Sequence, residues 1–127
     1  MSSNYFFYKD GTDLKRIHLE NIYFLESAGN YVKFFFNEKE FITVRTPLEV
    51  LMVQMLPRDQ FVQISRSHAV RIACIEIIAK EGVFLRGIKV RLPLSRIYLS
   101  ELLVRINVLD STLPKAIPRM RAQGDSD

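Results

Sequence analysis

The chain has 127 residues, of which 48% are hydrophobic and 25% charged, and these values fit one globular domain rather than a disordered segment. The net charge is +4, and the basic excess lies in the second half: twelve Lys/Arg stand against seven Asp/Glu from Arg58 onward, compared with six against seven before it. This imbalance favours a polyanionic partner. A single cysteine excludes an internal disulfide, and neither a secretory leader nor a membrane-spanning run is recognisable. The sequence therefore predicts a cytoplasmic protein with no membrane segment in this chain.

The first 44 residues predict a series of short strands. Phe and Tyr are concentrated in the first half of the chain, and aromatic residues at this density favour strands. Turn signals at Asp10-Gly11, at 28–30 and at 37–39 divide the segment. The expected strands are 4–8, 14–19, 21–27, 31–36 and 40–44, and the last three form an antiparallel meander.

A helix is predicted near 47–55. Thr46 is expected to cap it, with Pro47 at the first helical position and Glu49 three residues after the cap. The apolar residues Leu48, Leu51, Met52 and Met55 follow at spacings of three and four, which is typical of a helix face packed on a core.

The second half predicts further strands, a C-terminal helix and a tail. The expected strands are 60–64, 74–79, 83–86 and 88–92, with residues 65–71 as an exposed strand segment. A helix over 96–106 would place Leu99, Leu102, Leu103 and Ile106 on one side. The pattern is lost beyond Leu109, so a domain over 1–109 and a flexible tail over 110–127 are expected.

The search for catalytic chemistry predicts that the chain is not an enzyme and holds no metal or cofactor. His18 and His68 lack ligand spacing, and the five glycines are isolated. Ser65, Ser67 and His68, if on a strand, would alternate faces and form no triad. Carboxylates such as Glu26 and Glu101 stand singly and are expected to be solvated, and Cys74 is expected to be a buried, inert thiol.

The chemistry of DNA recognition singles out a few polar projections. Arginine can meet both acceptors of a guanine, and the candidates are Arg66, which is flanked by small polar residues, and Arg96, at a helix start, where their charge need not be buried. Arg66 could instead be a surface ion-pair residue, and Arg96 a solvated first-turn residue, although the helix dipole disfavours a cation there. Asn30 and Tyr31 form a third projection, unless Tyr31 is partly buried in the sheet. Residues that could hold the phosphate backbone are Lys33, Arg45, Arg71, Lys89 and Arg91.

Four ordered segments resemble the LytTR family of DNA-binding domains. Residues 19–33, LENIYFLESAGNYVK, are similar to the family's "I-x-Y-I-E-A-x-x-N-Y" strand and turn. The capped helix at 47–56 follows, then FVQISRSHAV at 61–70, which resembles "F-x-R-x-H-R-S-x-x-V-N". VRLPLSRIY at 90–98 resembles the family's strand-to-helix junction. Together the matches extend over residues 4–107.

The resemblance implies a mainly β fold of elongated, mostly antiparallel sheets with short helices, whose loops enter successive major grooves of double-stranded DNA. It implies a bacterial transcription regulator of the response-regulator type in a two-component system, with a receiver or sensor partner and possible homodimers on repeated half-sites. Three positions depart from the pattern: Gln63 replaces an arginine, Ser65 a histidine and Arg71 an asparagine. The expected DNA-binding residues are Asn30, Tyr31, Lys33, Ser65, Arg66, Ser67, His68, Arg71, Arg91, Ser95 and Arg96.

Two other functions remain open on the sequence alone. The aromatic strands 4–8 or 31–36 could pair edge to edge with a protein partner, which would make the chain an interaction or oligomerisation module. Exposed aromatic side chains could also stack on unpaired bases of a single strand.

Overall fold

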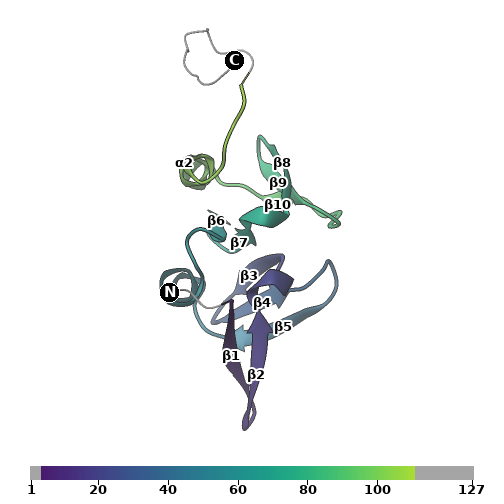
Figure 1. Cartoon of the computed structure of the whole chain (residues 1–127), viewed down its shortest axis with the longest axis vertical. Coiled ribbons are helices and arrows are strands. Elements are labelled where there is room, and N and C mark those ends of the chain that lie inside the picture. The colour runs from purple at the N-terminus through teal and green to yellow at the C-terminus, as the bar shows by residue number, and fades with distance from the viewer. Residues whose placement is uncertain (1–3, 111–127) are drawn as a thin grey trace.

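The computed structural model describes residues 4–110, which form three antiparallel sheets and two short helices arranged along one long axis (Figure 1). This confirms the predicted mainly β fold. A hairpin of β1 (Tyr5–Asp10) and β2 (Asp13–His18) lies at one end of the molecule. The sheet of β8 (Ile75–Ala79), β9 (Gly82–Leu85) and β10 (Leu92–Pro93) lies toward the other end, beside α2 (Arg96–Val104).

A five-stranded sheet lies between these ends. Its strands are ordered β5-β4-β3-β7-β6, and their bounds are β3 Phe24–Ala28, β4 Tyr31–Phe35, β5 Phe41–Arg45, β6 Phe61–Ser65 and β7 His68–Arg71. The predicted meander is confirmed as β3, β4 and β5, paired in antiparallel register. Strand β3 begins only at Phe24 because Leu19–Asn21 forms a 3₁₀ turn.

Both faces of the five-stranded sheet are buried. Alternate residues of each strand point to opposite faces, so Phe24 and Val70 join one core while Leu25 and Ala69 join the other. The first core also takes in Val83 and Leu85 of β9 and Leu102 of α2. The second contains Ile17 of β2 together with Leu48, Leu51 and Leu56. Two separate cores therefore fix the sheet, and the strand ends and turns remain on the surface.

The first helix departs from its predicted cap. Helix α1 covers Leu48–Val50 and continues as a π-helix, Leu51–Met55, which the Leu56 N–H closes by donating to the Leu51 carbonyl. Pro47 occupies the N-cap with ψ 146°, and no side chain caps the helix. The capping role predicted for Thr46 is wrong, because the helix starts one residue later than expected.

Three other local predictions were wrong. Residues 88–92 do not form a strand: Gly87 turns the chain at φ +78°, and only Leu92 and Pro93 pair with β9. Residues 65–71 are not continuous strand, because Arg66 and Ser67 form the turn between β6 and β7. Helix α2 ends at Val104 and packs on the core through Leu99 and Leu102, which leaves Leu103 43% exposed; Ile106 packs on the same core from beyond the helix.

Burial of Cys74, as predicted, is confirmed. Among residues 4–110, no helix has the length and apolar character needed to cross a membrane. Apart from Asp110, the predicted tail lies outside the described residues.

Candidate nucleic-acid interface

The turn that carries Arg66 is held by the side chains of Gln63 and Ser65, which both belong to β6. The Gln63 amide donates to the carbonyls of Ser65, at 3.0 Å, and of Arg66, at 3.2 Å. The Ser67 N–H donates to the Ser65 hydroxyl at 3.3 Å. These bonds fix the backbone of the turn and leave the Arg66 side chain exposed.

Two backbone hydrogen bonds bring three of the predicted segments together. The Ser27 N–H donates to the Ser67 carbonyl at 2.7 Å, which joins the end of β3 to the Arg66 turn. The Ser95 N–H donates to the Ile64 carbonyl at 2.9 Å, which joins the start of α2 to the end of β6. The hairpin after β3 carries Asn30, so segments far apart in the sequence meet at the same end of β6 and β7.

Arg66 and Arg96 are both exposed. Within the described part of the chain, neither Arg66 nor Arg96 has a carboxylate at ion-pair distance. Arg96 is the first residue of α2, where the positive end of the helix dipole adds to its charge. Both the guanidinium and the helix start therefore favour a nearby anion.

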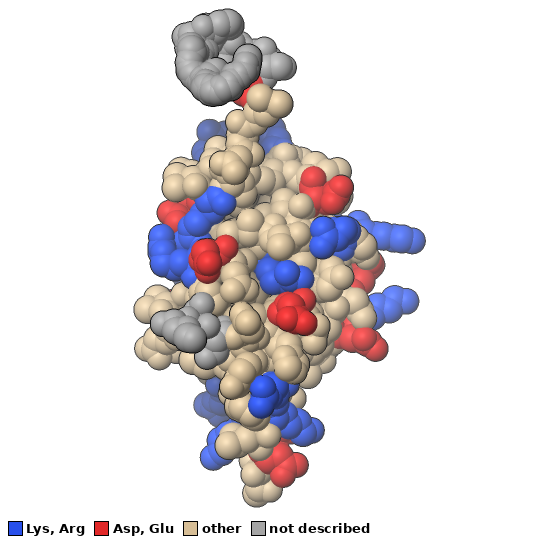
Figure 2. Space-filling model, viewed as in Figure 1, with Lys and Arg blue, Asp and Glu red and all other residues tan. Residues whose placement is uncertain are grey.

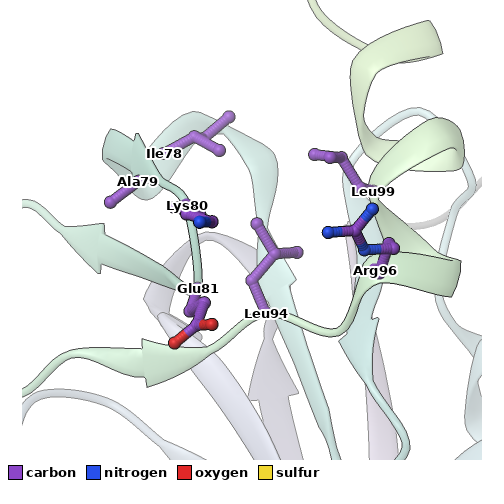
Figure 3. Close-up of a pocket in the computed structure, with 7 residues that line it drawn as sticks. All are labelled: Ile78, Ala79, Lys80, Glu81, Leu94, Arg96 and Leu99. Carbon is purple, nitrogen blue, oxygen red and sulfur yellow. The ribbon is translucent and has the colours of Figure 1, made fainter.

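Arg96 also borders an open hollow of about 580 Å³ between α2 and the β8–β9 hairpin. Figure 3 shows Arg96 and Leu99 on one side of it, with Lys80 and Glu81 on the other. Lys80 was missed in the sequence analysis, although a lysine directly before the predicted Glu81-Gly82 turn was a usable signal. Its ammonium is a second cation lining this hollow.

Ser65 and His68 are turned inward. Ser65 is 6% exposed and the His68 side chain 12%. The Ser65 and Ser67 hydroxyls lie 3.0 and 3.2 Å from His68 Nδ1, and a Glu26 carboxylate oxygen lies 3.4 Å from its Nε2. Burial lowers the pKa of His68 more than the Glu26 carboxylate raises it. Glu26 is thus not merely solvated, as the sequence analysis expected.

The other predicted residues have varied surroundings. The Arg71 guanidinium donates to the carbonyls of Ile22 and Glu20, at 2.7 and 2.9 Å, which ties β7 to the chain before β3. The Lys33 ammonium lies 4.9 Å from the Phe41 ring centroid. Tyr31 is 45% exposed at the start of β4, so it is partly buried in the sheet, as the alternative expected, and still reaches the surface. The side chains of Asn30, Arg45, Lys89, Arg91 and Arg96 are exposed, and that of Ser95 is half-buried.

Charge is mixed over the face shown in Figure 2. Basic side chains are interspersed with acidic ones there, and several project from the edge beside the β8–β9–β10 sheet. No continuous basic surface covers this view. Binding to a polyanion would therefore depend on individual projections held in place by the turns.

The chain is thus a β scaffold of stacked antiparallel sheets that presents exposed arginines from a turn and from a helix start. The model of the LytTr DNA-binding domain family matches residues 12–107, and the chain belongs to this family. The family is one of DNA-binding domains without enzymatic activity, as predicted.

The fold is similar to that of a solved LytTr DNA-binding domain. That domain belongs to a putative methyl-accepting/DNA response regulator from Bacillus cereus; the TM-score is 0.60 at 21% sequence identity, covering 79% of this chain and 94% of that one. At this identity the likeness shows the fold alone. The comparison with curated proteins found no match.

Proposed function

We propose that this LytTR domain regulates transcription by binding double-stranded DNA in a sequence-dependent manner, with Arg66 and Arg96 reading base edges. The observation that carries the proposal is the Ser95–Ile64 backbone bond, which fixes the start of α2 against the strand leading to Arg66. Two guanidinium groups on a rigid support, without carboxylate partners among residues 4–110, are suited to bidentate contacts with guanine.

Phosphate contacts would come from the surrounding cations. Lys80 lines the same hollow as Arg96, and Arg91 is exposed near β10. Such contacts orient a protein on the duplex and make affinity fall with salt, but they carry no base information. Asn30 and Tyr31 would contribute from the β3–β4 hairpin. Arg71 uses two of its donors on carbonyl groups, so its DNA contact stays a prediction that depends on the remaining ones.

The regulatory setting is proposed by analogy. The similar Bacillus cereus domain belongs to a protein described as a putative methyl-accepting/DNA response regulator. We propose that the present domain likewise works in the cytoplasm, as the DNA-binding output of a two-component system with a receiver or sensor partner, and as a homodimer on repeated half-sites. Duplexes with one or two half-sites should then bind one or two copies, measured by analytical ultracentrifugation.

The central test is selection of bound duplexes from a random pool, followed by affinity measurements on the selected site. Arg66→Ala and Arg96→Ala should each lose about 5- to 150-fold in affinity for that site, since a bidentate base contact is worth about 1–3 kcal/mol. Arg86→Ala is the matched control, because it removes an exposed cation outside the three segments. Wild-type affinity in both test variants would refute the assignment.

A protein-interaction module remains the second candidate. Its specific support is the β1–β2 hairpin, where Tyr5 and Phe7 are 41% and 45% exposed and their rings contact each other edge to face. Self-association in ultracentrifugation that is unaffected by duplex DNA would favour this candidate.

A further inference from the structure

A row of polar residues crosses the five-stranded sheet beneath the Arg66 turn. Register pairs Ser65 of β6 with His68 of β7, His68 with Glu26 of β3, and Glu26 with Lys33 of β4. The row lies on the face of the sheet that otherwise contributes Phe24 and Val70 to a hydrophobic core. Ser65 and His68 are the least exposed members of the row, and polar groups buried in such a place need hydrogen-bond partners.

The partners of His68 define the direction of the hydrogen bonds. A Glu26 carboxylate oxygen, which can only accept, lies 3.4 Å from Nε2, so the arrangement favours the neutral tautomer with its proton on Nε2 and with Nδ1 accepting from a serine hydroxyl. The nearer hydroxyl is that of Ser65, which in turn accepts the Ser67 N–H. One chain of contacts therefore runs from Glu26 through the imidazole and Ser65 to the backbone next to Arg66.

We infer that Glu26 and His68 are positioning residues for Arg66: they hold the imidazole and Ser65 in the one arrangement that fixes the turn, and they do not themselves touch DNA. This inference rests on the proposed function. His68 has both ring nitrogens engaged and its side chain is 12% exposed, which leaves it little to offer a base. A carboxylate such as Glu26 would be repelled by phosphates.

The arrangement contains the residue types of a Ser-His-acid triad, and its geometry opposes that role. Ser65 is 6% exposed, so a substrate carbonyl has no access to its oxygen. The same oxygen already accepts the Ser67 N–H. The network therefore supports the Arg66 turn that would recognise DNA, and it does not form a catalytic site.

The test combines Glu26→Gln with Arg66→Ala in a double-mutant cycle, using the selected duplex and a random duplex. Glu76→Gln is the control, because it removes the same charge from an exposed position on β8. Relative to this control, Glu26→Gln should lower the preference for the selected site about fivefold or more, as expected when part of a bidentate contact is lost. In the Arg66→Ala background it should cause no further loss.

Two outcomes would overturn the inference: an unchanged preference in Glu26→Gln, or an equal loss with and without Arg66. If Arg66→Ala alone leaves the preference unchanged, the proposed reading role of Arg66 fails instead. A measurement without DNA tests the positioning role of Glu26 separately from the reading role of Arg66. Nitrogen NMR of the His68 ring should show the Nε2–H form in the wild type and a mixture of the two neutral forms in Glu26→Gln, and an identical spectrum in both would also overturn the inference. Unfolding midpoints verify that the variants fold.

Discussion

Replacing Gly82 by alanine should displace Arg91 and leave the fold intact. Gly82 pairs with Ala79 and Pro93, and an added Cβ would lie 2.3 Å from both Cγ and Cδ of Arg91. Ordinary carbon contacts are about 3.5–4.0 Å, so the arginine stem must move by about 1.5 Å. Arg91 is exposed and flexible, and loss of glycine's freedom in the unfolded chain stabilises by about 0.4–1 kcal/mol. The free energy of unfolding should therefore change by less than about 1 kcal/mol.

Gly82→Ala should change DNA binding although it leaves stability nearly unchanged. If Arg91 holds one phosphate, displacing it makes the slope of log affinity against log salt concentration shallower by about 0.9. Between about 50 and 200 mM salt, the variant should then lose about 3.5-fold less affinity than the wild type loses. Fluorescence anisotropy with a labelled duplex measures this. Arg91→Ala should give the same slope, and Gly82→Ala combined with it no further change. A wild-type slope in stable Gly82→Ala protein would refute the reasoning, and a loss of more than about 2 kcal/mol would show that the backbone yields instead.

Stability should depend on pH through His68, whose pKa burial lowers below the unfolded value. The contribution of neutral His68 to the free energy of unfolding is complete above about pH 6.5 and is lost as the pH falls toward the folded pKa. The free energy of unfolding in urea should therefore fall between about pH 7.5 and 5.5 in the wild type and should fall less in His68→Gln. An equal dependence on pH in the two proteins would contradict this. The Arg105 guanidinium donates to the carbonyls of Arg58 and of buried Phe61, so Arg105→Ala should lower the free energy of unfolding by about 2–3 kcal/mol. Arg58→Ala removes only an exposed ion pair and should lower it by less than about 1 kcal/mol. Similar losses in the two variants, measured by urea unfolding, would refute this difference. Burial raises the pKa of the Cys74 thiol and shields it from reagents. Its reaction with a disulfide reagent should therefore proceed at the rate at which the folded protein opens around Cys74, and rapid labelling of the native protein would be inconsistent with this.

Sequence patterns predicted the elements whose signals are local. The meander of β3, β4 and β5 followed from aromatic runs separated by turn residues, and α2 from its apolar spacing. The cap at Thr46 failed because the pattern does not show where the helix starts: Pro47 keeps an extended ψ and takes the cap position itself. The expected strand at 88–92 failed because Ile88 and Leu92 fill a core while Val90 is exposed, and within this segment only Leu92 pairs with β9.

The candidate site was only partly predictable, because its arrangement depends on contacts between distant segments. Arg66 and Arg96 were found from side-chain chemistry and from the resemblance to a family. Their link through Ile64 and Ser95 depends on how α2 packs on β6, which no local pattern specifies. The same holds for Glu26, which stands alone in the sequence and meets His68 only when β3 and β7 pair.

Burial of the five-stranded sheet on both faces has a consequence for how recognition can change. The cores occupy the faces, so side chains at the rim carry little of the packing energy, and exchanges there should be tolerated within about 0.5 kcal/mol when they avoid the bonds that hold each bend. A library randomised at positions 30, 66 and 96 could thus be screened for new operator preferences on an unaltered frame. Mutations at these rim positions should therefore change DNA specificity without changing the fold.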